Sequence, residues 1–167
     1  MDIYDEEFVS FLSVLNHFQV KYIMVGGVAT NLHGYNRGTD DIDAWIKNTT
    51  ENRKLLRNAL KEYSSIDYFM IVDMQIIPGW THFNLNNGTR LDLMVDMKGL
   101  ENYTFDECLK AATIATIENV PVPFLHINHL IQNKKAVNRP KDQLDVIYLE
   151  KIKQLLQEAE DNAKHQL

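Results

Sequence analysis

Apolar residues recur along the chain with two different periods, which predicts a protein of mixed helices and strands. Helical spacing (i, i+3, i+4, i+7) is clearest in three long segments, and short apolar or alternating runs of strand type lie between them. Helices are predicted over residues 6–18, 28–33, 51–63, 105–112 and 127–163, the last with a break at Arg139-Pro140. Strands are predicted over residues 22–25, 41–46, 68–72, 74–77, 80–85, 89–96, 113–117 and 120–125.

The order of these elements divides the chain into two parts. All predicted strands lie within residues 1–125, whereas residues 126–167 are predicted to be mostly helical. We therefore expect an α/β (α+β) domain over residues 1–125, built on a mixed β-sheet with flanking helices. A C-terminal helical extension over residues 126–167 is expected to pack on it. The length of 167 residues is sufficient for one domain with a full core.

One stretch, residues 22–46, combines backbone and side chains that suit charged ligands. Its first apolar run ends at Gly26-Gly27, and a short helix follows. Glycines between a strand and a helix let a ligand approach the backbone, and the N–H groups at the start of a helix attract anions. The next strand begins Asp41-Ile42-Asp43. Residues i and i+2 of a strand point to the same face, about 6.6 Å apart. Asp41 and Asp43 are therefore predicted to share one site.

This pair of carboxylates is expected to bind a cation. Two carboxylates this close repel each other by a few kcal/mol at an effective dielectric of about 20. A divalent ion removes that cost. Carboxylate oxygens suit Mg²⁺ and Mn²⁺, and Mg²⁺ in proteins often takes further oxygens from substrate phosphates. The stretch therefore predicts a site for a triphosphate with its magnesium ions.

A third carboxylate is expected from the predicted hairpin strand over residues 89–96. Arg90, Asp92, Met94 and Asp96 share the polar face of this strand. Asp92 and Asp96 are four residues apart, or about 13 Å along an extended strand, so both cannot serve one metal pair. Strand geometry alone does not choose between them.

The glycine turn and the two aspartates together resemble the nucleotidyltransferase superfamily. The pattern of that superfamily is a Gly-Gly or Gly-Ser turn, a spacer, and then Asp-hydrophobic-Asp or Glu; here thirteen residues separate Gly27 from Asp41. The run Arg37-Gly38-Thr39-Asp40-Asp41-Ile42-Asp43 is most similar to the small prokaryotic branch. That branch includes the minimal nucleotidyltransferases and the AbiEii-type toxins of toxin–antitoxin systems.

The resemblance implies an enzyme that moves a nucleoside monophosphate from an NTP to an acceptor hydroxyl and releases pyrophosphate. Asp41 and Asp43 would hold two magnesium ions, and Asp92 is preferred over Asp96 as the third acid because relatives carry it soon after the hairpin turn. Relatives with Gly-Ser use the hydroxyl on the phosphates, whereas Gly27 offers only its backbone N–H. The implied NTP-binding residues are Gly26, Gly27, Arg37, Thr39 and Lys135, with Lys134 as the alternative to Lys135.

The sequence does not choose between several classes of acceptor. The toxin-like resemblance implies a tRNA end or a protein, with an antitoxin as partner, and other relatives use the hydroxyl of an antibiotic. Four cations between Lys134 and Lys141 favour RNA, whereas the net charge of −6 disfavours it. Two alternatives to the transferase are a catalytically silent nucleotide-binding or protein-interaction module and a phosphohydrolase that uses the same metals.

The composition bears on the cellular location of the protein and on the kinds of site it can form. No apolar stretch approaches the eighteen or so residues of a membrane helix, and the first seven residues are too acidic for a signal peptide. Cys108 is the only cysteine, which excludes an intrachain disulfide and a cysteine-based zinc cluster. We therefore expect a cytoplasmic protein with no membrane partner.

Overall fold

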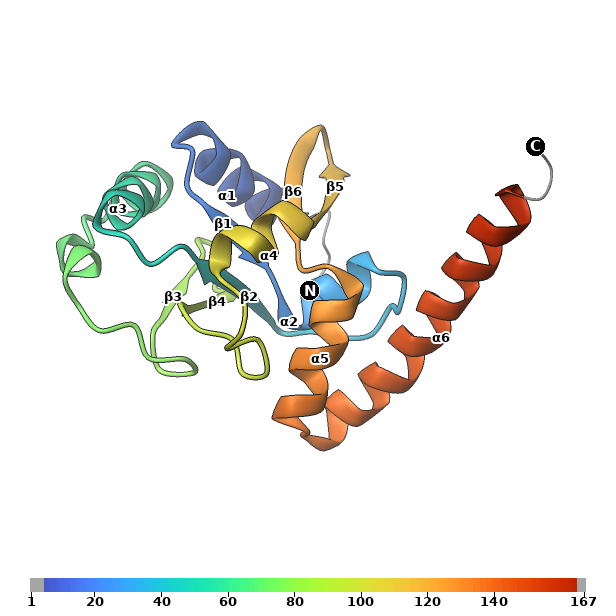
Figure 1. Cartoon of the computed structure of the whole chain (residues 1–167). Coiled ribbons are helices and arrows are strands. Elements are labelled where there is room, and N and C mark those ends of the chain that lie inside the picture. Colours follow the sequence, from blue (N-terminus) through green and yellow to red (C-terminus); the bar gives the residue numbers. More distant parts are fainter. Residues whose placement is uncertain (1–4, 165–167) are drawn as a thin grey trace.

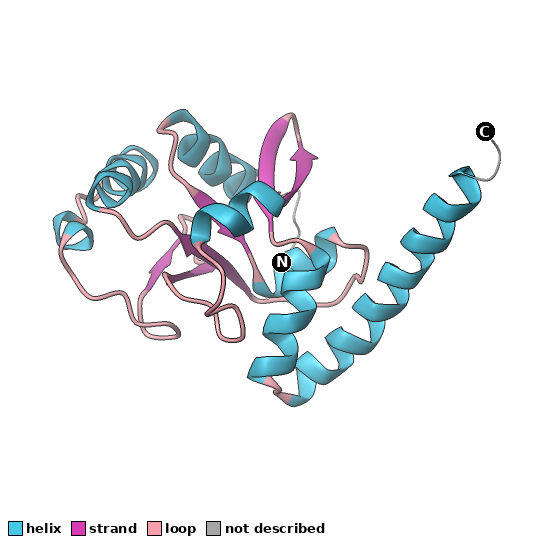
Figure 2. Ribbon diagram, viewed as in Figure 1, coloured by secondary structure: helices cyan, strands magenta, loops and turns pink. Residues whose placement is uncertain are grey.

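The computed structural model describes residues 5–164 as one mixed sheet with helices around it and a long helix at the C-terminal end (Figures 1 and 2). The helices are α1 (Glu6–His17), α2 (Gly26–Leu32), α3 (Thr50–Ser64), α4 (Phe105–Ala111), α5 (Ile127–Val137) and α6 (Pro140–Lys164), with a short 3₁₀ helix η1 (Phe69–Val72). The strands are β1 (Tyr22–Met24), β2 (Asp41–Ile46), β3 (His82–Asn84), β4 (Arg90–Met94), β5 (Thr113–Ile117) and β6 (Val120–Phe124).

The sheet has the strand order β3-β4-β2-β1-β6-β5. Strand β2 lies near its centre, antiparallel to β1 and parallel to β4, so the predicted mixed sheet is confirmed. The parallel register pairs Asp43 of β2 with Asp92 of β4. Because side chains alternate between the two faces of a strand, this register places both carboxylates on the same face.

The two faces of β2 have different surroundings. Ile42, Ala44 and Ile46 are almost fully buried in the core, to which the paired helices α1 and α3 contribute Phe8, Phe11, Leu12, Leu15, Leu56, Ala59 and Leu60. On the other face, the Trp45 ring meets the Phe105 ring of α4 edge-on, with centroids 5.3 Å apart. Near the start of β2, the face that carries Asp41 and Asp43 lies against the glycine turn, and both residues are only partly buried.

The segment between α3 and β3 departs from the predicted structure. The strands predicted over residues 68–72 and 74–77 are wrong: residues 69–72 form η1, and the rest is irregular. The side chain of Arg53, buried on α3, donates to the backbone oxygens of Ile71 (3.3 Å) and Met74 (2.6 Å). These two contacts hold the segment against α3, and the apolar run turns back instead of extending the sheet.

The C-terminal extension is a helix pair, as predicted, with its break at Arg139-Pro140. Asn138 adopts a left-handed conformation (φ 59°) that ends α5, and Pro140 begins α6. Figure 1 shows α6 running away from the sheet, with only its first part near the rest of the molecule. There the Tyr148 ring stacks on Tyr35, with centroids 4.0 Å apart. Among residues 5–164, no helix has the length and apolar character needed to cross a membrane.

Candidate active site

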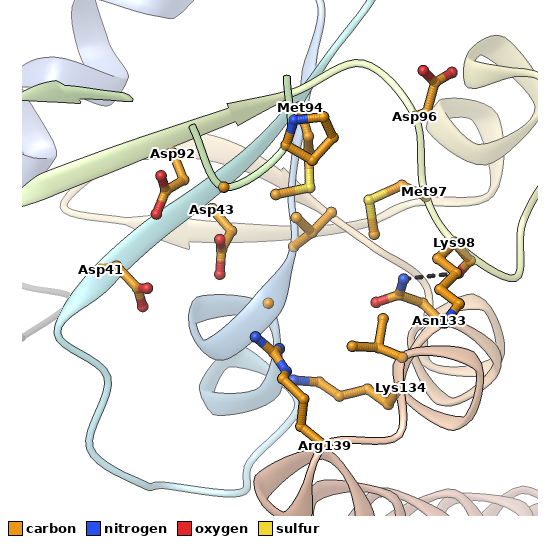
Figure 3. Close-up of a pocket in the computed structure, with 15 residues that line it drawn as sticks. Asp41, Asp43, Asp92, Met94, Asp96, Met97, Lys98, Asn133, Lys134 and Arg139 are labelled. Carbon is orange, nitrogen blue, oxygen red and sulfur yellow. Dashed lines mark hydrogen bonds between the residues drawn. The ribbon is translucent and has the colours of Figure 1, made fainter. Parts of the chain in front are cut away.

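Three carboxylates converge on one face of the sheet, at the start of β2 and the middle of β4. Asp41, Asp43 and Asp92 each offer a carboxylate oxygen, and these oxygens lie within 4.8 Å of one another. Figure 3 shows the three side chains grouped on the same side of the strands, with Asp96 well away from them. The structure therefore places Asp92, and not Asp96, with the predicted pair.

The glycine turn after β1 makes room for this cluster. Gly26 has a φ of +58°, a conformation that side chains rarely adopt, and a Cβ at this position would collide with the Asp43 carboxylate. The backbone N–H of Val25 donates to the carbonyl oxygen of Asp43 (3.0 Å), which fixes the turn against β2. Glycine is required here because the acidic strand passes directly over the turn.

The electrostatics of the cluster are unfavourable without a cation. Burial is the main cause that raises the pKa of Asp43 to about 6, and the negative charges of Asp41 and Asp92 raise it further. The positive charges of Lys134 and Lys141 act in the opposite direction but do not cancel these effects. A site that disfavours its own ionised form in this way gains most from a bound divalent ion.

The cluster opens into a pocket of about 280 Å³ between the sheet and the region where α5 ends and turns into α6. Figure 3 shows cationic side chains across the pocket from the carboxylates. The pocket is lined by Val25, Gly26, Asp41, Asp43, Pro78, Gly79, Asp92, Met94, Asp96, Met97, Lys98, Asn133, Lys134, Val137 and Arg139. Acidic and basic walls that face each other suit a ligand that carries phosphates together with a metal ion.

A neighbouring arginine holds the third carboxylate. Arg90 donates through Nε (3.0 Å) and Nη2 (2.7 Å) to the same oxygen of Asp92, Oδ1, and Nη2 also donates to the carbonyl oxygen of Gly79 (3.1 Å). Arg90 and Asp92 lie two residues apart on β4, so the strand period alone indicates this neighbour. Both arginine contacts use Oδ1, so the oxygen Oδ2 of Asp92 receives neither of them.

The segment before β2 supports the first aspartate. The hydroxyl of Thr39, which is buried, donates to the backbone oxygen (3.1 Å) and to Oδ1 (3.2 Å) of Asp41. A Cβ at Gly27 would collide with Thr39 and would come within 3.4 Å of Arg37 Nη1. Gly27 therefore allows this segment to lie against the glycine turn, with the hydroxyl of Thr39 beside the place that a residue-27 side chain would take.

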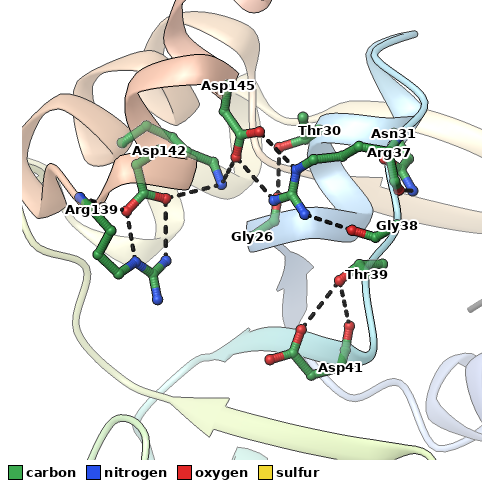
Figure 4. A network of polar contacts seen from close by, with 11 residues as sticks. Gly26, Thr30, Asn31, Arg37, Gly38, Thr39, Asp41, Arg139, Asp142 and Asp145 are labelled. Carbon is green, nitrogen blue, oxygen red and sulfur yellow. Dashed lines mark hydrogen bonds and ion pairs between the residues drawn. The ribbon is translucent and has the colours of Figure 1, made fainter.

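A network of paired charges joins the same segment to the helix pair (Figure 4). Asp145 of α6 accepts from Arg37 Nε (2.7 Å) and Nη2 (2.9 Å), and it forms an ion pair with Lys134 Nζ (2.6 Å). Asp142 binds Arg139 Nε (2.7 Å) and lies 3.5 Å from Lys134 Nζ. Both aspartates and Lys134 are almost completely buried. The network fixes two cations, Lys134 and Arg139, at the wall of the pocket.

The predicted lysine at position 135 lies elsewhere. Lys135 is exposed and forms an ion pair with Glu150 (2.6 Å), outside the residues that line the pocket. Lys134, the alternative, is the lysine in the pocket. The two are adjacent on α5, and only the direction in which the helix faces the sheet distinguishes them.

The donor set fits magnesium. The three residues offer only carboxylate oxygens, which are the ligands that Mg²⁺ and Mn²⁺ prefer, and burial together with like-charge repulsion raises the pKa of Asp43. Asp41, Asp43 and Asp92 are the residues that would hold the ions.

Comparison with solved structures finds the same architecture in several nucleotidyltransferases. The lincomycin-bound lincosamide antibiotic adenylyltransferase LnuA shares 16% identity over 89% of this chain and 97% of its own, with a TM-score of 0.57. An antigenic nucleotidyltransferase-like protein from Paracoccidioides brasiliensis shares 18% over 86% of this chain and 74% of its own, with a TM-score of 0.53. The protein has the nucleotidyltransferase fold.

A further neighbour of the same fold is ANT(2")-Ia in complex with adenylyl-2"-tobramycin, with 18% identity over 88% of this chain and 91% of its own and a TM-score of 0.51. No protein-family model and no curated protein matches the sequence. The nucleotidyltransferase fold agrees with the resemblance seen in residues 26–43, whereas membership of the AbiEii-type branch stays a prediction.

Three contributors to this site are not apparent from the sequence motifs. Arg90 could have been found from its place on the polar face of the strand that carries Asp92. The backbone at Pro78 and Gly79 lines the pocket because Arg90 binds the Gly79 carbonyl, which no local pattern indicates. Asp145 lies more than a hundred residues from Arg37, and only the tertiary structure brings them together.

Proposed function

We propose that the protein transfers a nucleoside monophosphate from an NTP to the hydroxyl of an acceptor. The acceptor oxygen forms a bond to the α-phosphorus, the bond from that phosphorus to the bridging oxygen of the β-phosphate breaks, and pyrophosphate leaves. The observation that carries the proposal is the cluster of Asp41, Asp43 and Asp92 on one face of the sheet of a nucleotidyltransferase fold.

Each wall of the pocket has a part in this proposal. Asp41, Asp43 and Asp92 would hold two magnesium ions, and Asp92 would accept the proton of the acceptor hydroxyl. The ions supply neutralisation of the phosphate charge and a lower pKa for the attacking hydroxyl. On the opposite wall, Lys134 and Arg139 attract the phosphates as charged donors.

The remaining predicted residues bind or position the nucleotide. The backbone of Gly26 and Gly27 gives the β- and γ-phosphates close access to N–H donors. Thr39 holds Asp41 in place, and Arg37 holds Asp145, which in turn fixes Lys134. Most of the rate enhancement then comes from alignment of the two reactants and from preorganised charge. Because NTPs are cytoplasmic substrates, a cytoplasmic location is part of the proposal.

A small molecule is the acceptor that the comparisons favour. LnuA is a lincosamide antibiotic adenylyltransferase, and ANT(2")-Ia was solved with adenylyl-2"-tobramycin. A tRNA or protein acceptor and an antitoxin partner rest on the sequence resemblance to the toxin-like branch, and for RNA also on the four cations between Lys134 and Lys141. The net charge of −6 also disfavours a nucleic acid.

The test is a labelling experiment with each α-labelled NTP, Mg²⁺ and a cell extract separated into RNA, protein and small-molecule fractions. We expect label in one fraction with the wild type and with Asp96→Asn. We expect a loss on the order of 10³-fold with Asp43→Asn and with Asp92→Asn, because each removes a carboxylate that would hold the metal ions that stabilise the transition state. Wild-type labelling by Asp43→Asn would refute the metal assignment.

Two other results would replace the proposal. Labelling in no fraction, together with NTP binding that survives Asp92→Asn, would indicate the silent binding module. Release of inorganic phosphate from γ-labelled NTP in the absence of any acceptor would indicate a phosphohydrolase.

A further inference from the structure

One side-chain amide in the wall of the catalytic pocket presents a fixed hydrogen-bond acceptor. Asn133 of α5 lines the pocket, and only 9% of the residue is exposed. Its Nδ2 donates to the backbone oxygen of Lys98 (2.9 Å). A carbonyl oxygen can only accept, so this bond determines which end of the Asn133 amide is the nitrogen. The other end, Oδ1, cannot be exchanged for a donor without loss of the bond to Lys98.

Oδ1 of Asn133 borders the open space of the pocket. Among the residues that the structure describes, no donor contacts this oxygen. In the same part of the chain, the fully enclosed side-chain nitrogens and oxygens without a partner are limited to His129 Nδ1, so Oδ1 of Asn133 is not enclosed by protein. Figure 3 shows it pointing toward the middle of the pocket. Because buried polar groups in folded proteins are paired, this oxygen is expected to accept a hydrogen bond from a molecule in the pocket.

Apolar side chains share this pocket with Asn133. Met94 and Met97 line it, and Val137 lies four residues after Asn133, on the same face of α5. Thioether sulfurs make favourable contacts with aromatic rings. Apolar walls with a small number of placed polar atoms suit a flat ring that carries an N–H donor at its edge.

The two sides of the pocket attract different parts of a nucleotide. Figure 3 shows the charged ends of Lys134 and Arg139 on the side of the carboxylates, whereas Asn133 lies on the other side. The charged residues on that other side, Asp96 and Lys98, have opposite signs. Phosphates that contact the metal ions and the two cations therefore leave the base, at the opposite end of the nucleotide, to extend toward Asn133.

The bases of the common NTPs differ in the group that they present at this end. The ring edge farthest from the sugar carries an amino group in adenine and cytosine, but a carbonyl oxygen in guanine and uracil. A fixed acceptor binds the amino group. Two carbonyl oxygens that face each other leave both acceptors unpaired, which is costly in a buried site.

We propose that Asn133 selects the NTP by its base, and that Oδ1 accepts a hydrogen bond from the amino group of adenine or cytosine. Guanine and uracil are rejected because their carbonyl oxygen meets an acceptor that the bond to Lys98 holds in place. The inference rests on the transferase function proposed above and adds the class of NTP that the same site uses.

The first test measures binding without transfer. The probes are the α,β-methylene analogues of ATP, ITP, CTP and UTP, in which a carbon replaces the bridging oxygen that would leave with pyrophosphate. ATP and its inosine counterpart ITP differ in whether this ring position carries an amino group or a carbonyl oxygen, and CTP and UTP differ in the same way. Isothermal titration calorimetry with Mg²⁺ should show roughly tenfold tighter binding of the amino member of each pair.

A matched pair of variants assigns this preference to one residue. Asn133→Leu removes the acceptor and should abolish the preference. The control is Gln132→Leu, which should keep it: Gln132 makes the same kind of contact, from Nε2 to the backbone oxygen of Gly99 (2.6 Å), but it is exposed and lies outside the pocket lining. Asn133→Ala, which adds no apolar bulk, makes the same comparison if Asn133→Leu does not fold.

Three results of these titrations would overturn the inference. They are equal affinity of the wild type for the two members of each pair, absence of binding by all four analogues, and a preference that persists in the folded Asn133 variant.

The labelling experiment separates this inference from the transferase function. We expect label from α-labelled ATP or CTP, and not from GTP or UTP. Labelling from GTP or UTP as strong as that from ATP and CTP would overturn the role of Asn133 but leave the transferase function standing. If no NTP labels any fraction, the transferase function fails, and the titrations still decide whether Asn133 selects the base.

Discussion

The aspartates of the carboxylate cluster and those of the charge network beside it have opposite electrostatic surroundings. In the network, Asp142 and Asp145 receive direct ion pairs from Lys134, Arg37 and Arg139. In the cluster, three carboxylates face one another, and Asp43 has a pKa raised to about 6. Paired charges hold the helix pair to the sheet. In the cluster Asp92 forms an ion pair with Arg90, but Asp41 and Asp92 still raise the pKa of Asp43 by their negative charge, in addition to the larger effect of burial. The difference indicates which of the two acidic groups is built for a ligand.

The largest effect should follow from breaking the network. Asp145→Asn leaves Lys134 and Arg37 without their shared carboxylate in a buried site, and we expect a loss of about 3–5 kcal/mol in the free energy of unfolding. The control is Glu150→Gln, which breaks the exposed pair with Lys135 and should cost less than about 1 kcal/mol. Both are measured by urea denaturation; equal losses would show that the network has no special structural role.

In the carboxylate cluster, removal of a charge is expected to increase the free energy of unfolding. In the folded protein the Asp43 carboxyl has a pKa of about 6, compared with 3.8 for its ordinary value. The folded state therefore binds more protons between these values, so the stability that Asp43 contributes is present below about pH 4 and is lost as the pH rises through 6. We expect metal-free Asp43→Asn to be more stable than the wild type at pH 8, by up to roughly 3 kcal/mol, with the difference shrinking toward pH 4.

Bound Mg²⁺ should reverse the order of stability of the wild type and Asp43→Asn. Mg²⁺ at pH 8 should raise the unfolding midpoint of the wild type but not that of Asp43→Asn, since binding to the folded state alone stabilises it. Thermal denaturation of both proteins with Mg²⁺ or EDTA across this pH range checks the prediction. A wild type that is more stable than the variant in EDTA at pH 8 would contradict the reading of the cluster as a strained site.

The smallest change in stability is expected at Gly27, where the carboxylate cluster and the charge network meet. A Cβ at Gly27 would press on Thr39, which supports Asp41, and would approach Arg37, which belongs to the network. Gly27→Ala should lower the free energy of unfolding by about 1–3 kcal/mol through overpacking. Gly38→Ala is the matched control, because a Cβ there meets nothing within 4 Å, and it should change stability by at most about 0.5 kcal/mol. Similar values for the two variants would mean that the segment can move aside.

Local pattern was enough for most elements of the fold. The apolar spacing located the helices, and the alternation in residues 41–46 located the central strand. The pattern failed at residues 68–77, because an apolar run there was folded back by the buried side chain of Arg53, whose carbonyl partners lie about twenty residues away. The apolar spacing of a segment does not indicate such a contact with a distant residue.

The same limit applies to the site. Asp41 and Asp43 are two residues apart on one strand, so the sequence determined that they share a face, and the glycine turn followed from the motif. The resemblance already preferred Asp92 over Asp96, and the tertiary structure places Asp92 with the pair. The choice of Lys134 over Lys135 and of Asp145 as partner for Arg37 was decided by tertiary structure alone. Strand register, helix orientation and chain crossing set those distances, and each depends on packing between segments far apart in the sequence.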